Sequence, residues 1–181
     1  RAMRGELEFE PALRERVALL KGLERTILEQ VFRERITLTP GARTLARTMT
    51  ENGAKTVIVS GGFTFFTERV AEAAGFERHH ANVLEISDGK LSGKVHEPIL
   101  GQQAKLDALR SYTGELSIKR EETMAVGDGA NDLAMIGEAG LGFAFRAKPL
   151  VAEKAQARIN HADLRALLFA QGYRHQEFVE D

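Results

Sequence analysis

The amino-acid sequence predicts an α/β protein in which a parallel sheet is flanked by helices and preceded by a small helical segment. From residue 38 onward, short apolar runs alternate with helical patterns, which is typical of parallel sheets. Two of these runs, 55–60 (KTVIVS) and 123–126 (TMAV), lead into glycine-containing turns. The residues before them show helical spacing only. We therefore expect a helical domain over residues 1–36 and a sheet-containing core over residues 37–181.

Composition excludes several classes of protein. The chain has 181 residues, a net charge of −1 and no cysteine. That charge lacks the basic bias of a nucleic-acid binder, and the missing cysteines exclude disulfides and thiolate metal sites. No apolar run approaches the roughly 20 residues of a membrane span. We expect a cytoplasmic protein without nucleic-acid or membrane partners, and we leave self-association open.

The N-terminal half is expected to contain helices, one buried strand and one hairpin. Breaks near Gly5 and Gly22 divide the helical segment, which should form a small bundle without strands. Helices are expected over 42–52 and 65–74, each followed by a glycine. The strand 55–60 should end in the turn Ser60-Gly61-Gly62-Phe63. Two arms, 81–86 and 90–95, should form a hairpin around Asp88-Gly89.

The C-terminal half continues the alternation of helices and strands. The expected elements are a helix over 102–112, strands over 123–126 and 141–145, and helices over 150–157 and 164–171.

Two acids at the end of the strand 123–126 are candidates for a metal site. Gly127 and Gly129 allow a sharp turn around Asp128, and Asp132 falls in the first turn of the next helix. Both acids can then face the crevice where open α/β sheets bind ligands, and clustered carboxylates suit Mg²⁺. The alternative is an ordinary turn aspartate followed by an acid that is favoured at a helix N-terminus.

Two further positions are candidates for binding an anion. Ser60 and the Gly61 amide lie at a strand end before a helix, where N–H groups can hold a phosphate, although a tight turn also selects small residues. Lys105 lies in the first turn of a helix, where a cation is unfavourable unless it has an anionic partner. Most lysines are simply solvated. A parallel sheet could nevertheless bring Ser60, Lys105 and Asp128 to one edge.

The string GDGANDLAMI resembles the fourth motif of the haloacid dehalogenase superfamily of phosphohydrolases. In chain order, Ser60, Lys105 and the pair Asp128 and Asp132 resemble motifs two, three and four, and the resemblance covers essentially the whole chain. It implies a Rossmann-like parallel sheet with a small helical cap. The stretches AMRGELEFEPALRERVALLKGL, VSGGF and ISDGKLSGKV narrow the resemblance to the branch that hydrolyses phosphoserine.

The resemblance implies a role for each matching residue. Asp128 would bind Mg²⁺, and Asp132 would support the metal site. Phosphate would be held by Ser60, Gly61, Lys105 and Asn131, and Lys105 would also neutralise the phospho-enzyme.

Three residues of the helical segment would contact the rest of the substrate. Arg16 would take the substrate carboxylate, because its planar guanidinium matches a carboxylate bidentately. Met3 and Phe9 would close over the substrate. A solvated helix face is the alternative for Arg16.

The sequence departs from the superfamily in one respect. The superfamily uses an aspartate nucleophile and an acid-base aspartate in a D-x-D-x-T turn, and no D-x-D occurs in these residues. Since the chain begins with Arg1 rather than Met, we expect this motif and its central strand to be encoded upstream. The chain alone should be inactive and should not fold stably as a monomer.

Three other identities share part of this pattern. A cation-pumping ATPase has a similar G-D-G-x-N-D turn but also needs membrane helices and a D-K-T-G-T stretch, which are absent here. A sugar-phosphate phosphatase of the same superfamily usually has a larger cap. A degenerate fragment that binds a ligand or a partner is the non-enzymatic alternative.

Overall fold

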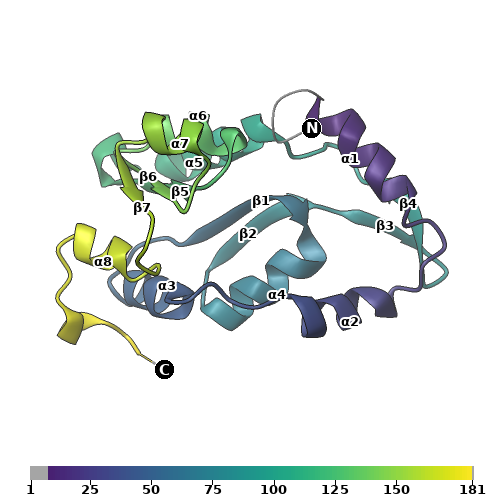
Figure 1. Ribbon diagram of the computed structural model, residues 1–181, viewed down its shortest axis with the longest axis horizontal. Coiled ribbons are helices and arrows are strands. Elements are labelled where there is room, and N and C mark those ends of the chain that lie inside the picture. Colours follow the sequence, from purple (N-terminus) through teal and green to yellow (C-terminus); the bar gives the residue numbers. More distant parts are fainter. Residues whose placement is uncertain (1–7, 181) are drawn as a thin grey trace. The chain divides into compact units, whose positions relative to one another are not determined.

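The computed structural model describes residues 8–180, which divide into two compact units (Figure 1). Unit 1 is built on Leu100–His161, and unit 2 on Pro11–Ile99 and the segment from Ala162 onward. Each unit is an α/β structure with parallel strands, as the sequence predicts. The boundary expected between residues 36 and 37 stays a prediction. No helix among residues 8–180 is long and apolar enough to cross a membrane.

Unit 2 contains most of the helices that the N-terminal half predicts. Its elements are α1 (Phe9–Ala18, which begins just before the unit), α2 (Thr26–Arg35), α3 (Ala42–Glu51), β1 (Val57–Phe63), α4 (Thr64–Ala74), β2 (Arg78–Asn82), β3 (Leu84–Ser87), β4 (Lys90–Val95) and α8 (Ala166–Ala170).

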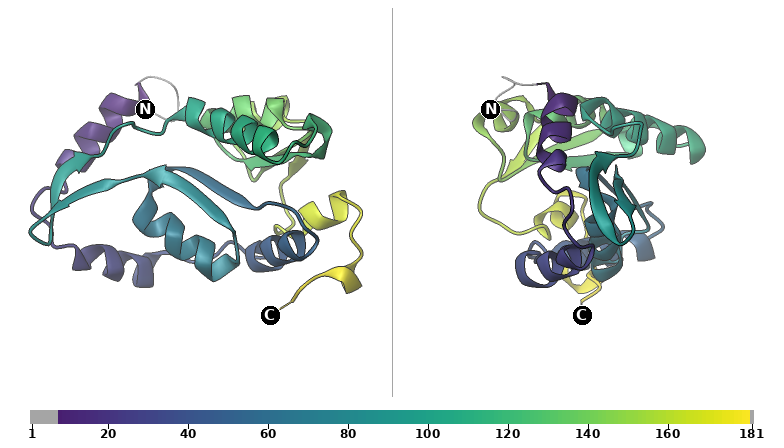
Figure 2. Two further views of the ribbon diagram at one scale, coloured as in Figure 1. Left: turned by 180° about the vertical axis from the view of Figure 1, so that it is seen from behind. Right: turned by 90° about the vertical axis from the view of Figure 1, so that its right-hand side faces the viewer.

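A parallel pair of strands, β1 and β2, forms the centre of unit 2. α4 connects them and packs against both strands, while α3 packs against α4 (Figure 2). Ala46 and Ala74 are completely buried, which lets these helices approach closely. Gly75 ends α4 with a φ of 87°, the left-handed conformation expected of a glycine after a helix.

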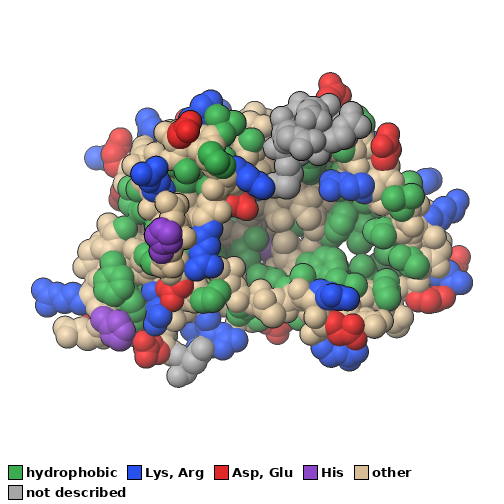
Figure 3. Space-filling view, in the orientation of Figure 1, with side chains coloured by type: hydrophobic (Ala, Val, Ile, Leu, Met, Phe, Trp, Pro, Cys, Tyr) green, Lys and Arg blue, Asp and Glu red, His purple; other side chains and the backbone are tan. Residues whose placement is uncertain are grey.

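The helical segment at the start of the chain is only partly buried in unit 2. Leu13, Val17 and Leu28 are buried, but Leu19 and Leu23 are 83% and 43% exposed. Figure 3 shows other places where hydrophobic side chains reach the surface on the face that it draws. The segment after α1 also forms an antiparallel bridge, Glu24 with Lys90 of β4. As expected, residues 8–36 form helices and no strand, and this short stretch after α1 only pairs laterally with β4.

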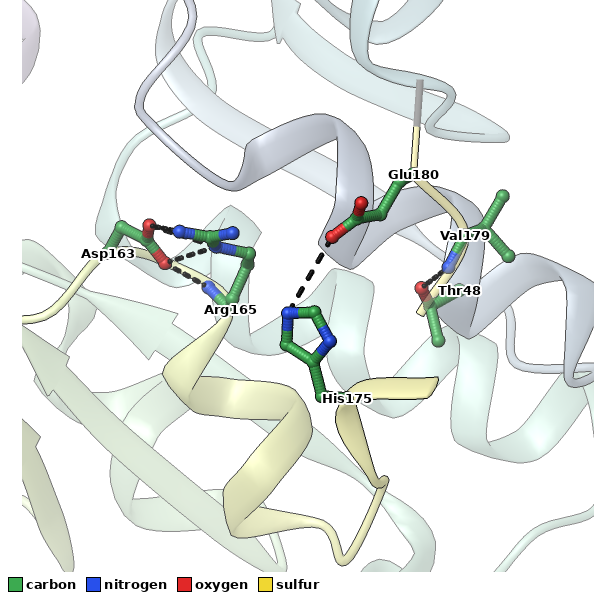
Figure 4. A network of polar contacts seen from close by, with 6 residues as sticks. All are labelled: Thr48, Asp163, Arg165, His175, Val179 and Glu180. Carbon is green, nitrogen blue, oxygen red and sulfur yellow. Dashed lines mark hydrogen bonds and ion pairs between the residues drawn. The ribbon is translucent and has the colours of Figure 1, made fainter. Parts of the chain in front are cut away.

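The C-terminal residues pack on α3 (Figure 4). The Val179 amide donates to Oγ1 of buried Thr48 at 2.9 Å. Phe178 is also buried, and its ring lies 4.9 Å from that of Phe169. His175 Nε2 lies 3.8 Å from a carboxylate oxygen of Glu180 at the surface (Figure 4). The tail is therefore part of the core of unit 2.

Unit 1 contains a three-stranded parallel sheet in the order β5-β6-β7. Its elements are α5 (Gln102–Glu115), β5 (Met124–Gly127), α6 (Leu133–Glu138), β6 (Leu141–Phe145), α7 (Pro149–Lys154) and β7 (Ala157–Ile159).

Close packing of α6 and α7 on the central strand β6 forms the core of unit 1. Ile136, Ala144 and Val151 are at most 1% exposed. A Cβ on Gly142 would lie only 2.1 Å from the Ile136 carbonyl oxygen. Only glycine therefore allows α6 to pack this closely on β6.

The structure corrects the expected strand boundaries. β1 continues through Ser60, Gly61 and Gly62 to Phe63 instead of ending in a turn, and its residues are half-buried rather than buried. The predicted hairpin exists, with Asp88 at φ 50°, but its first arm begins at Leu84. The preceding residues belong to β2, which was missed because its sequence, RHHAN, has no apolar run. β7 was missed because it spans only three residues.

Each sheet has a free edge among the described residues. β1 pairs only with β2, and β5 pairs only with β6.

Candidate functional site

Asp132 holds together the loop that follows β5. Its Oδ2 accepts hydrogen bonds from the backbone amides of Asp128 and Gly129, each at 3.0 Å. Its Oδ1 accepts from Nζ of Lys105 at 2.5 Å. Both carboxylate oxygens are therefore used inside the protein, and Asp132 is 3% exposed. The expectation that it faces an open crevice is wrong.

Two glycines make this loop possible. A Cβ on Gly127 would lie 2.4 Å from the Asp132 Cβ, and a Cβ on Gly129 would lie 2.5 Å from Oδ1 of Asn131. A side chain at Gly127 would push the Asp132 carboxylate away from the amides, whereas one at Gly129 would displace the Asn131 side chain. The loop is also held from outside, because the Lys148 amide donates to the Asp128 carbonyl at 3.0 Å.

Lys105 has the anionic partner that its position in a first helical turn requires. It lies in the first turn of α5, and its side chain is only 12% exposed. Asp132 compensates the buried ammonium group, which would otherwise be costly to desolvate. The ion pair holds the Lys105 ammonium group at the base of the Asp128 loop. Sequence reasoning singled out Lys105 but did not identify this partner.

Asp128 has the free carboxylate of the site. The residue is exposed, and its carboxylate has no ion pair or hydrogen bond within residues 8–180. Asn131, also exposed, lies three residues further along the loop. No group of three His, Cys, Asp or Glu that could hold a metal occurs in the described part of the chain. Mg²⁺ needs only one or two carboxylates when waters and phosphate oxygens complete its shell, so Asp128 fits as one ligand.

Ser60 and Gly61 lie in a bulge of β1 in unit 2. The register moves from Val59 opposite His80 to Phe63 opposite Asn82, so four steps along β1 match two along β2. The Gly62 amide donates to Oγ of Ser60 at 3.0 Å. The expected small-residue loop therefore exists, although inside a strand.

The remaining candidates lie near the N-terminus. Arg16 is on the exposed face of α1, where its Nε donates to the Ala12 carbonyl at 3.2 Å. Phe9 is half-buried, and its ring lies 3.4 Å from the position of a Cβ on Gly101. Met3 lies outside the described residues.

Unit 1 thus brings Lys105, Asp128, Asn131 and Asp132 together in one loop and the helix beside it. Ser60, Gly61 and Arg16 belong to unit 2, and their meeting with the loop stays a prediction. Asn82 was missed by sequence reasoning. Its side chain donates from Nδ2 to the Gly61 carbonyl at 3.0 Å.

Comparisons with known proteins agree with this geometry. The family model described as haloacid dehalogenase-like hydrolase matches residues 2–137. The chain is 45% identical over 176 residues to a phosphoserine phosphatase of Streptomyces coelicolor, covering 97% of this chain and 43% of that protein. It is also 45% identical over 172 residues to a phosphoserine phosphatase of Polaromonas sp., covering 92% of this chain and 73% of that protein.

Solved structures give the same match. A substrate-bound phosphoserine phosphatase complex aligns with a TM-score of 0.86 and 41% identity, over 93% of this chain and 80% of that one. An unliganded probable phosphoserine phosphatase from Vibrio cholerae aligns with a TM-score of 0.86 and 42% identity, over 93% of this chain and 52% of that one. The chain therefore spans only part of the length of the proteins that it matches.

Proposed function

This chain belongs to the haloacid dehalogenase-like hydrolases, and from that membership we propose that the protein is a Mg²⁺-dependent phosphoserine phosphatase. The reaction would release serine and phosphate through an aspartyl-phosphate, as the last step of serine biosynthesis in the cytoplasm. The observation that carries the proposal is the buried pair of Lys105 and Asp132 beneath the exposed carboxylate of Asp128. Relatives with this activity in their names, 45% identical over most of the chain, support the substrate.

Each residue of the loop has a distinct part in the proposal. Asp128 would hold Mg²⁺, which supplies charge stabilisation for the phosphoryl oxygens. Lys105, held in place by Asp132, would neutralise the phosphoryl group with its ammonium. The Asn131 side-chain amide can donate to one of its oxygens, and Ser60 with the Gly61 amide would donate to the others.

The helical cap would recognise the serine part of the substrate. Arg16, exposed on α1, has a guanidinium that can bind the carboxylate bidentately. Met3 and Phe9 would close over the bound substrate. Only a substrate with both a carboxylate and a phosphate would engage the cap and the core together.

The proposal concerns the whole protein, because these 181 residues contain no D-x-D pair to supply the nucleophile. We propose that residues 1–36 belong to the cap and residues 37–181 to a core that needs a further strand. The edges of β1 and β5, which have no partner among residues 8–180, support that extra strand. The aspartate pair of the superfamily would lie at its end.

A substrate assay tests the proposed function. The full-length protein should hydrolyse phosphoserine with Mg²⁺ and should lose this activity in excess chelator. A panel of sugar phosphates provides the comparison. Preference for a sugar phosphate would favour the sugar-phosphatase alternative, and no hydrolysis of any phosphomonoester would favour a non-catalytic binding protein.

A further inference from the structure

The bulge in β1 has to be held in place by groups outside the regular ladder. Two extra residues between Val59 and Phe63 interrupt the register with β2. A bulge turns backbone groups away from their usual partners, so other donors and acceptors have to satisfy them. Within the bulge, Oγ of Ser60 accepts from the Gly62 amide.

Asn82 supplies the contact from the opposite strand. It is the last residue of β2, and its Nδ2 donates to the Gly61 carbonyl at 3.0 Å. Asn82 is only 1% exposed and is among the largest fully buried side chains of the described residues. A buried amide held this way can adopt few other rotamers. The orientation of the Gly61–Gly62 peptide, whose N–H donates to Ser60 Oγ, is therefore coupled to one side chain of β2.

We propose that Asn82 is a positioning residue for phosphate binding at Ser60 and Gly61. The inference rests on the proposed function and adds a residue to it. The Asn82 amide holds the Gly61 carbonyl inside the sheet, which fixes the Gly61–Gly62 peptide and restricts the rotation of the adjoining peptide that carries the Gly61 N–H before an anion arrives. Preorganised donors bind an oxyanion more tightly than donors that have to reorient. Asn82 itself touches no substrate.

The test uses Asn82→Asp in the full-length protein. The substituted side chain has nearly the same shape, but as a carboxylate it cannot donate to the Gly61 carbonyl. We expect KM for phosphoserine, KM for an aryl phosphate and the inhibition constant of inorganic phosphate all to rise by about tenfold, the effect of weakening one hydrogen bond to a charged phosphate oxygen. The Mg²⁺ requirement should stay the same. Because a protonated carboxyl can donate again, the loss should shrink as the pH is lowered.

Thr67→Val is the matched control. Thr67 is buried, and its Oγ1 lies 3.1 Å from Nδ1 of His79 on β2, away from the bulge. The control removes a buried hydrogen bond of the same sheet and should leave the three constants unchanged. Urea unfolding of both variants establishes that they are folded under assay conditions.

Two results would overturn the inference. If folded Asn82→Asp protein keeps the two KM values and the phosphate inhibition constant of the parent, Asn82 is structural only. The same conclusion follows if its phosphate binding is weakened no more than that of Thr67→Val. Ser60→Ala separates this failure from failure of the proposed function. If Ser60→Ala weakens phosphate binding and Asn82→Asp does not, the proposed function stands and the positioning role of Asn82 is excluded. An inactive parent protein that binds no phosphate removes both.

Discussion

Nζ of Lys105 donates to Oδ1 of Asp132 at 2.5 Å, and the two side chains are only 12% and 4% exposed. The other carboxylate oxygen of Asp132 holds the amides of Asp128 and Gly129. One buried carboxylate therefore fixes both the cation and the loop that carries the proposed metal ligand. Through this arrangement Asp132 would support the proposed metal site without touching the metal.

Asp132→Asn should damage both stability and activity. The substitution leaves the buried ammonium of Lys105 without a compensating charge, which costs about 3 to 5 kcal/mol. Urea unfolding should show that loss, and phosphoserine hydrolysis should fall by at least about a hundredfold. Adding Lys105→Met should restore part of the stability and none of the activity. If Asp132→Asn alone is as stable as the parent, the ion pair does not contribute to stability as proposed.

Asp128→Asn should separate function from stability. The carboxylate is exposed and without a partner among the described residues, so its loss should change the unfolding free energy by less than about 0.5 kcal/mol. Hydrolysis should nevertheless fall steeply, and half-maximal activity should require more Mg²⁺. A magnesium titration of the rate measures this. Full activity of the parent in excess chelator would exclude the metal assignment.

Gly127→Ala should disrupt the loop by steric overlap. The added methyl group would lie 2.4 Å from the Asp132 Cβ, which forces the carboxylate off the backbone amides. We expect a loss of about 1 to 3 kcal/mol in stability, with reduced activity. Gly137→Ala is the control, because its methyl group would meet nothing within 4 Å in α6. That helical substitution should be stabilising by about 0.5 to 1 kcal/mol.

Arg16→Ala should change substrate preference. If the guanidinium binds the carboxylate of phosphoserine, its loss should raise KM for phosphoserine by about one to two orders of magnitude. KM for an aryl phosphate without a carboxylate should hardly change. The control is Arg14→Ala. Arg14 lies on the same helix as Arg16, and its loss removes a surface ion pair with Glu97. An equal rise on both substrates would assign Arg16 a structural role.

Glu77 should make stability depend on acid pH. The hydrogen bond from Lys55 lowers the pKa of the Glu77 carboxyl from its ordinary value in the folded protein. Because the pKa is lower in the folded protein, the ionised carboxylate stabilises the fold at every pH above the pKa of the unfolded chain. This stabilisation is lost as the pH falls through the pKa of the folded protein. Because the pair is partly exposed, it is worth about 1 kcal/mol at most. The free energy of unfolding should differ less between pH 7 and pH 3 for Glu77→Gln than for the parent protein.

Local features of this protein could be predicted from the sequence because they depend on neighbouring residues. The turn at Asp88-Gly89, the glycine after α4 and the strand 141–145 are all confirmed. The loop around Asp128 was also identified, because two glycines flank it within one short string. The family followed from the same string, since a complete motif is a contiguous feature.

Only the tertiary structure decided which groups these residues contact. Asp132 is paired with Lys105, which lies 27 residues away, and no local pattern specifies that contact. β2 forms because β1 provides a parallel partner for its backbone, although its side chains are mostly polar. Asn82 is buried for the same reason, since the register of that pairing places it opposite the bulge. Contacts that depend on register and on packing between distant elements are set by the fold, whereas turns and motifs are set by adjacent residues.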